Sequence, residues 1–142
     1  MKLRAEVLRQ LEDPALEPDD RARQRIQLSK KYEEIGDYEV ATQVLGDLWQ
    51  GVGVRPRLEQ LSDESTRGEV LLRVGTLTGW IGSPEQIQGA QEKAKDLLSE
   101  SIGIFERLND SAHAGEAQTE LAYCYWREGA FDEARVILTE VL

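Results

Sequence analysis

The sequence predicts an all-α protein of about seven helices, arranged as antiparallel pairs in one domain over residues 1–142. The first observation is an internal repeat: YWREGAFDEARVIL at residues 125–138 follows the pattern of YEEIGDYEVATQVL at residues 32–45. The second is composition, because only four prolines occur in 142 residues and 31% of the residues are charged. Such a composition is typical of helices rather than strands.

The N-terminal segment, residues 2–12, is expected to form a short helix. Its large apolar side chains recur at helical spacing, at Leu3, Val7, Leu8 and Leu11. The following DPALEPDD contains two prolines, which end the helix.

Hairpin 1 is predicted over residues 20–50. Its break falls at Gly36, since glycine adopts positive φ at a helix C-terminus without Cβ strain. Asp37 then favours the start of the second helix, where an acidic side chain complements the helix dipole. This second helix is expected to reach about Trp49.

Hairpin 2 is predicted over residues 62–108, after the glycine- and proline-containing break GVGVRPRLEQL. Ser62 is the expected N-cap of its first helix. The motif GSPEQ then supplies a helix-ending glycine, a capping serine, a first-turn proline and a capping-box glutamine, at Gly82, Ser83, Pro84 and Gln86. The motif predicts a long second helix over residues 84–108, because nothing in that stretch stops it.

Hairpin 3 is predicted over residues 112–142. Asn109 and Asp110 mark the preceding turn, and Gly129 separates a first helix from a second that begins near Phe131. The two copies of the repeat align at their glycines. The aligned pairs include Tyr32 with Tyr125, Tyr38 with Phe131, Ala41 with Ala134 and Leu45 with Leu138.

This alternation of small and aromatic residues around a glycine turn resembles the tetratricopeptide repeat family. The resemblance covers residues 25–48 and 118–141 well and residues 71–101 in part, because Ala94 lies too far from Gly82 unless about seven residues are inserted. It implies a right-handed α-solenoid of three repeat-like hairpins, the middle one irregular. The extra residues are expected to lengthen the second helix of hairpin 2.

In that family the first helices line a concave groove that binds a peptide or a partner helix. The resemblance therefore implies a non-enzymatic protein-interaction module, a scaffold or sensor segment of a larger protein or assembly. The residues implied to line the groove are Arg23, Lys30, Glu33, Glu69, Thr76, Trp80, Tyr123, Trp126 and Arg127. Trp, Tyr and Arg are enriched in binding hot spots, although Trp80 and Trp126 would equally suit packing between hairpins.

An alternative hypothesis is self-assembly as a homodimer. The last helix leaves an apolar edge that includes Val136, Ile137 and Val141, and a second copy could cover it together with the long helix 84–108. A third hypothesis, a small-molecule site near Trp80, would need convergent polar groups for which the sequence offers few candidates.

Composition argues against several other functions. The net charge of −10 disfavours nucleic-acid binding, which needs a basic surface. No catalytic, cofactor or metal site is predicted, because His113 is the only histidine and Cys124 the only cysteine, and each suits a structural position. No signal segment and no apolar run of about 18 residues occurs, so we expect a cytoplasmic protein without membrane contact.

Overall fold

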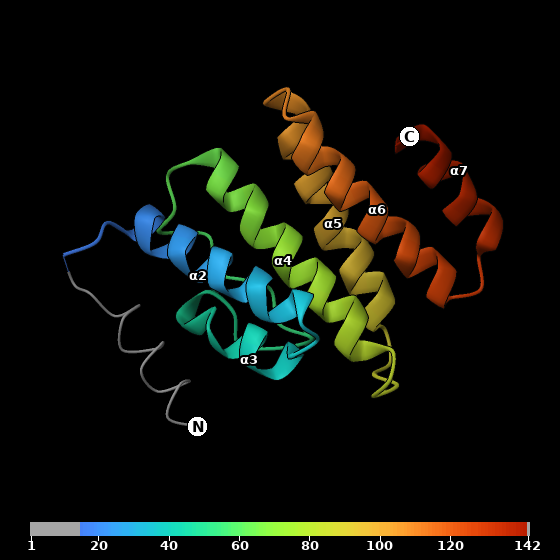
Figure 1. Ribbon diagram of the computed structural model, residues 1–142, viewed down its shortest axis with the longest axis horizontal. Coiled ribbons are helices and arrows are strands. Elements are labelled where there is room, and N and C mark those ends of the chain that lie inside the picture. The colour runs from blue at the N-terminus through green and yellow to red at the C-terminus, as the bar shows by residue number, and fades with distance from the viewer. Residues whose placement is uncertain (1–14, 142) are drawn as a thin grey trace.

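The computed structural model describes residues 15–141 and confirms the all-α class for that part of the chain, which contains no strand. The helix expected over residues 2–12 lies outside the described residues. The described α-helices are α2 (Pro18–Glu34), α3 (Tyr38–Gln43), α4 (Glu64–Gly82), α5 (Ala90–Arg107), α6 (Ser111–Arg127) and α7 (Phe131–Val141). They pack largely in chain order, and Figure 1 shows α2, α4 and α6 lying side by side.

Hairpin 1 consists of α2 and a second helix that is much shorter than expected. The predicted helix to Trp49 instead ends at Gln43 and is followed by a 3-10 turn over Gly46–Leu48. The cause is the buried side chain of Arg25, which donates a hydrogen bond to the Val44 carbonyl (3.1 Å). Its guanidinium lies against Gly46, where a Cβ atom would overlap it.

In hairpin 2 the predicted start of helix 84–108 is wrong, because α5 begins only at Ala90. Ser83 is the C-cap of α4 rather than an N-cap, and residues 83–89 form an exposed turn. The physical reason is the close approach of Gly82 and Ala90, which brings the end of α4 against the start of α5. The chain must reverse between them, so the inserted residues make a turn and do not extend a helix.

The structure also identifies the glycine that belongs to the repeat in hairpin 2. Gly36 and Gly129 have φ values of +82°, and Gly89 has +76°, whereas Gly82 is helical. Each left-handed glycine precedes a buried alanine by five residues, namely Ala41, Ala94 and Ala134. The sequence placed this turn at Gly82, seven residues too early.

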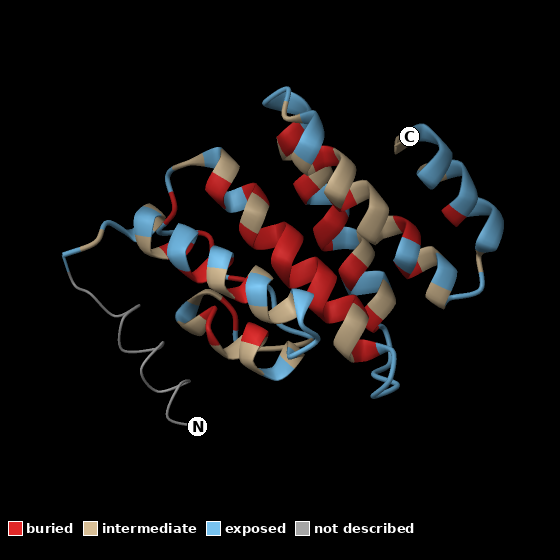
Figure 2. Cartoon of the chain, in the orientation of Figure 1, coloured by how far each residue is buried: buried red, intermediate tan, exposed pale blue. Residues whose placement is uncertain are grey.

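Helix α4 is the centre of the molecule and is buried on both sides, as the red ribbon in Figure 2 shows. Leu71, Val74 and Leu77 belong to the core shared with α2 and α3. Leu72 belongs to the core shared with α5 and α6. Because both sides are covered, α4 fixes the positions of its two neighbouring first helices.

Asp63 is the N-cap of α4, one residue beyond the predicted Ser62. The Asp63 carboxylate accepts hydrogen bonds from the backbone N–H of Thr66 (3.0 Å) and from its hydroxyl (2.7 Å). Ser62 donates instead to Asp19 of α2, at 2.6 Å from its hydroxyl. The bond between Ser62 and Asp19 thereby joins the two hairpins next to the cap of α4.

Candidate functional site

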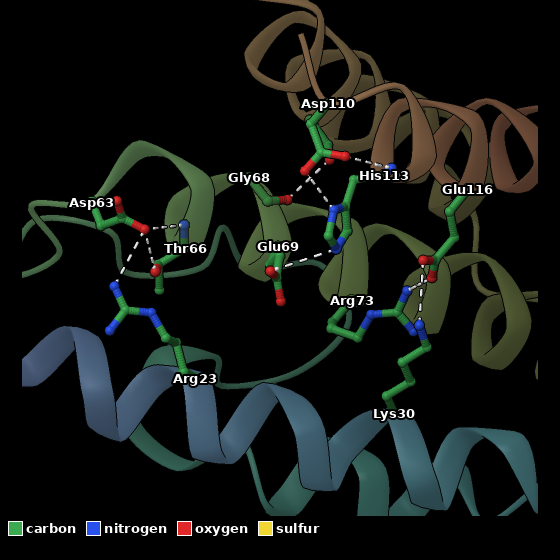
Figure 3. Close-up of polar contacts among 11 residues, drawn as sticks. Arg23, Lys30, Asp63, Thr66, Gly68, Glu69, Arg73, Asp110, His113 and Glu116 are labelled. Carbon is green, nitrogen blue, oxygen red and sulfur yellow. Dashed lines mark hydrogen bonds and ion pairs between the residues drawn. The ribbon is translucent and has the colours of Figure 1, made fainter. Parts of the chain in front are cut away.

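The predicted groove residues come from α2, α4 and α6, which lie next to one another, and most of them contact charged or aromatic neighbours. At the centre lies Arg73 of α4, whose side chain is only 2% exposed. It binds Glu33 of α2 (Nη1 to Oε1, 2.7 Å) and Glu116 of α6. Lys30 of α2 also reaches Glu116, at 3.4 Å (Figure 3). One buried cation therefore connects all three first helices.

Sequence reasoning missed Arg73 and Glu116. The available signal was a lone charged residue inside the apolar run VLLRVGTLTGW, since an arginine in a buried helix needs a carboxylate partner. The identity of that partner depends on tertiary packing. Glu33 and Glu116 are 40 and 43 residues away in sequence.

A second set of polar contacts lies on the same face, at the end formed by the N-terminal turns of α4 and α6. Arg23 lies 3.4 Å from Asp63, and Glu69 lies 3.6 Å from His113 Nε2 (Figure 3). His113 stands at the predicted helix start, where its Nδ1 is 2.7 Å from Asp110. Its ring stacks on Phe105 with a centroid separation of 4.8 Å. His113 is therefore partly buried by its neighbours.

Trp80 joins all three hairpins at the other end of the face. Its ring stacks on Tyr38 (6.3 Å, 9°), and Tyr123 packs against it at 5.6 Å. The Arg127 guanidinium lies 4.2 Å from the ring centroid, a cation–π geometry. The indole N–H donates to Glu120 (3.1 Å). Trp80 thus packs between hairpins.

The remaining predicted residues divide into exposed and buried ones. Trp126 is 59% exposed and Tyr123 40% exposed, so both are available at the surface. Thr76 is only 1% exposed, which places it beneath the face rather than on it. Helical spacing alone could not reveal this, because the helices on either side of α4 cover it.

Two carboxyl groups on this face have raised pKa values. Burial raises the pKa of Glu33 above its ordinary value, despite the opposing effect of Arg73. Burial also raises the pKa of Glu120, and the nearby Glu33 charge adds to the effect. The face therefore contains acidic groups that its own cations only partly compensate.

Other chemistry is limited in the described part of the chain. Cys124 is 1% exposed, and burial raises the pKa of its thiol to about 11, so it is a poor nucleophile at neutral pH. Within residues 15–141 no group of acidic, histidine or cysteine side chains is arranged to hold a metal ion. Nor does any helix there have the length and apolarity to cross a bilayer.

A pocket of about 760 Å³ lies away from the predicted groove residues, between the start of α2 and residues 57–61. Arg21, Arg25 and Arg57 line it together with Asp47 and Glu59. It shares no lining residue with the groove set.

The predicted C-terminal edge separates into two sides of α7. Val136 is 55% exposed, but Ile137 is half-buried and Val141 lies next to Gly115 of α6. The edge also exposes Phe131 (60%) and Leu138, which the prediction omitted. Their alignment with Tyr38 and Leu45 was the available signal.

Comparison with known proteins gives no further constraint. No family model matches the chain, and no curated protein or solved structure is significantly similar to it.

Proposed function

We propose that this chain is a non-enzymatic protein-interaction module, similar to a right-handed tetratricopeptide-like solenoid, that binds a peptide or partner helix on the face formed by α2, α4 and α6. The observation that carries the proposal is the exposure of Tyr123 and Trp126 beside a face whose charged residues hold one another in place. Exposed aromatics on a rigid support are favourable binding anchors, because little conformational entropy is lost. We place the module in the cytoplasm, as a segment of a larger protein or assembly.

The charge of the face favours a partner with basic side chains. Burial raises the pKa of both Glu33 and Glu120, and a nearby carboxylate adds to each shift, Glu116 for Glu33 and Glu33 for Glu120. A cation from a partner would stabilise the ionised forms of both groups. The overall charge of −10 would also speed the encounter with a basic partner.

The proposal is tested by site-specific photo-crosslinking in cells of the source organism. A photoreactive phenylalanine analogue replaces Tyr123, and a matched variant carries it at exposed Glu106 on α5. We expect Tyr123 to capture a defined protein that Glu106 does not. Equal capture from both positions would contradict a partner on this face.

Self-assembly is the second candidate, and the exposed side chains of α7 favour it. In this case a second copy would cover Phe131, Val136 and Leu138, without a foreign ligand. A mass that rises with protein concentration and returns to that of one chain in Leu138→Arg would support it.

A further inference from the structure

The repeat provides an internal comparison for the exposed end of the stack. Leu45 in hairpin 1 and Leu98 in hairpin 2 are both 0% exposed, whereas Leu138, at the matching place in hairpin 3, is 37% exposed. Leu98 stands in the same register because it follows Gly89 as Leu45 follows Gly36. The first two leucines are covered by the following hairpin. In the described residues, no hairpin follows α7.

Two further positions show the same difference. Tyr38 is stacked on Trp80 of α4, but its counterpart Phe131 is 60% exposed. Glu33 is bound by Arg73 of α4, and the residue at the same register in hairpin 3 is Trp126, which is 59% exposed. We call Trp126, Phe131 and Leu138 the end face.

Helix α4 shows what covers such a surface. It presents Leu71, Val74 and Leu77 to the core around Leu45, and at its end it places Trp80 on Tyr38. Arg73 lies on the flank, where it reaches Glu33. At the end face this flanking cation would meet Trp126, and a guanidinium over an indole is a favourable pair.

A second copy of this chain fits the end face poorly. On the outer side of α2 a half-buried Leu28 is surrounded by exposed polar residues, namely Gln24, Gln27 and Lys31. A copy stacked head to tail would therefore place amides and an ammonium group on Phe131 and Leu138. Two α7 helices facing each other would bring Asp132, Glu133 and Glu140 of both copies together.

We infer that the end face binds a helix of a different protein, with an α4-like pattern of aliphatic residues at helical spacing, an aromatic residue near its C-terminus and a cation on one flank. The inference rests on the proposed interaction function and adds a second surface to it. Binding would continue the α3–α4 type of packing already present in the chain.

The test uses the whole chain and a synthetic probe with the sequence of α4, residues 64–82, carrying a neutral polyethylene glycol tail for solubility. Titration calorimetry measures its binding to the wild-type chain and to three variants. Phe131→Asp and Leu138→Arg alter the end face. Val136→Asp is the matched control, because Val136 is more exposed than Leu138 and about as exposed as Phe131 but lies about 200° around α7 from Leu138.

We expect saturable binding that Phe131→Asp and Leu138→Arg each weaken by about tenfold or more, as removal of a central anchor does. Val136→Asp should leave the affinity unchanged, and a probe with Trp80→Ser should bind more weakly than the parent probe. Circular dichroism confirms that all variants fold, since the altered side chains are exposed.

Absence of binding up to about 500 μM probe would overturn the inference, as would equal loss in Val136→Asp. So would a concentration-dependent dimer of the chain that Leu138→Arg abolishes, because a second copy would then be the occupant. These outcomes leave the Tyr123 crosslink unaffected, so failure here is distinguishable from failure of the proposed function.

Discussion

Arg73 is the residue on which the α2–α4–α6 face depends most. An arginine at 2% exposure is tolerated only with ionic partners, because a buried cation without them costs several kcal/mol. Glu33 and Glu116 come from helices on either side of α4, so the ion pairs also fix how those helices approach one another.

Replacing Arg73 alone should therefore destabilise the fold. We expect Arg73→Met to lower the free energy of unfolding by about 3 kcal/mol, because two partly buried carboxylates lose their cation. Urea unfolding followed by circular dichroism measures the change. The control is the triple variant Arg73→Met/Glu33→Gln/Glu116→Gln, which should recover most of the loss. A single variant as stable as wild type would show that the ion pairs contribute nothing.

The raised pKa of Glu120 predicts an unusual dependence of stability on pH. Its folded pKa lies above the ordinary value of 4.5, so the folded state binds its proton more tightly than the unfolded state. The stabilisation that this tighter proton binding gives the folded state is complete below about pH 4.5 and is lost as pH rises through the folded pKa of Glu120. Glu120→Gln keeps an acceptor for the Trp80 N–H and removes this loss.

Thermal unfolding between pH 4.5 and 7 measures that prediction. The melting temperature of Glu120→Gln minus that of wild type should increase as pH rises across this range. Lowered pKa values of Asp19, Asp63 and Asp110 act in the opposite direction, but only below about pH 4, so they leave this range unaffected. A difference that is constant with pH would contradict the assignment to Glu120.

Among the elements, the turn of hairpin 2 shows how one glycine can be mistaken for another. Gly82 and Gly89 both stand where a helix can end, but they differ in what they do. Gly89 supplies a left-handed φ, and Gly82 supplies space for Ala90. Only the role of Gly82 depends on a neighbour eight residues away across the turn, Ala90.

The space around each glycine predicts the effect of replacing it with alanine. Gly82→Ala should cost about 1–3 kcal/mol, because its Cβ would overlap Ala90 and force α4 and α5 apart. Gly103→Ala on α5 should instead stabilise by roughly 0.5–1 kcal/mol, because its Cβ meets only the flexible end of Arg107 and alanine is the better helix former.

Chemical denaturation of both glycine variants checks the pair. Gly89→Ala should lie between them, losing about 1 kcal/mol to backbone strain without any steric overlap. If Gly82→Ala were neutral, the helices would have room to separate and the turn would not depend on that contact.

At the scale of the whole molecule, the helices of the described stack differ in how far they are covered. The α4 helix is covered on both sides, whereas α7 contacts mainly α6 and exposes Phe131 and Val136. A surface of this kind is available to a partner and is an aggregation risk without one.

We expect the purified chain to remain a monomer of 16.0 kDa over a hundredfold concentration range, since its own surfaces match the end face poorly. Light scattering coupled to gel filtration measures the mass. Phe131→Asp should reduce any slow aggregation without changing the monomer mass. A stable dimer at low concentration would instead favour the self-assembly hypothesis.

The sequence by itself determined the helical class, the repeat of hairpins 1 and 3 and the positions of their glycine turns, because these depend on local spacing and backbone freedom. It also placed the turn before α6 at Asn109 and Asp110. The Asp110 carboxylate caps α6 by accepting a hydrogen bond from the backbone N–H of His113. These features follow from interactions within a few residues.

Only the tertiary structure decided the length of α3, the turn at residues 83–89 and the burial of Thr76. Arg25 ends α3 from 19 residues away, and Gly82 meets Ala90 because two helices pack closely. For the site, the resemblance to the tetratricopeptide repeat implied that Lys30, Glu33, Trp80 and Tyr123 share one face. The role of Arg73 required knowledge of which carboxylates packing brings to it, since ion pairing acts through space and has no fixed sequence spacing.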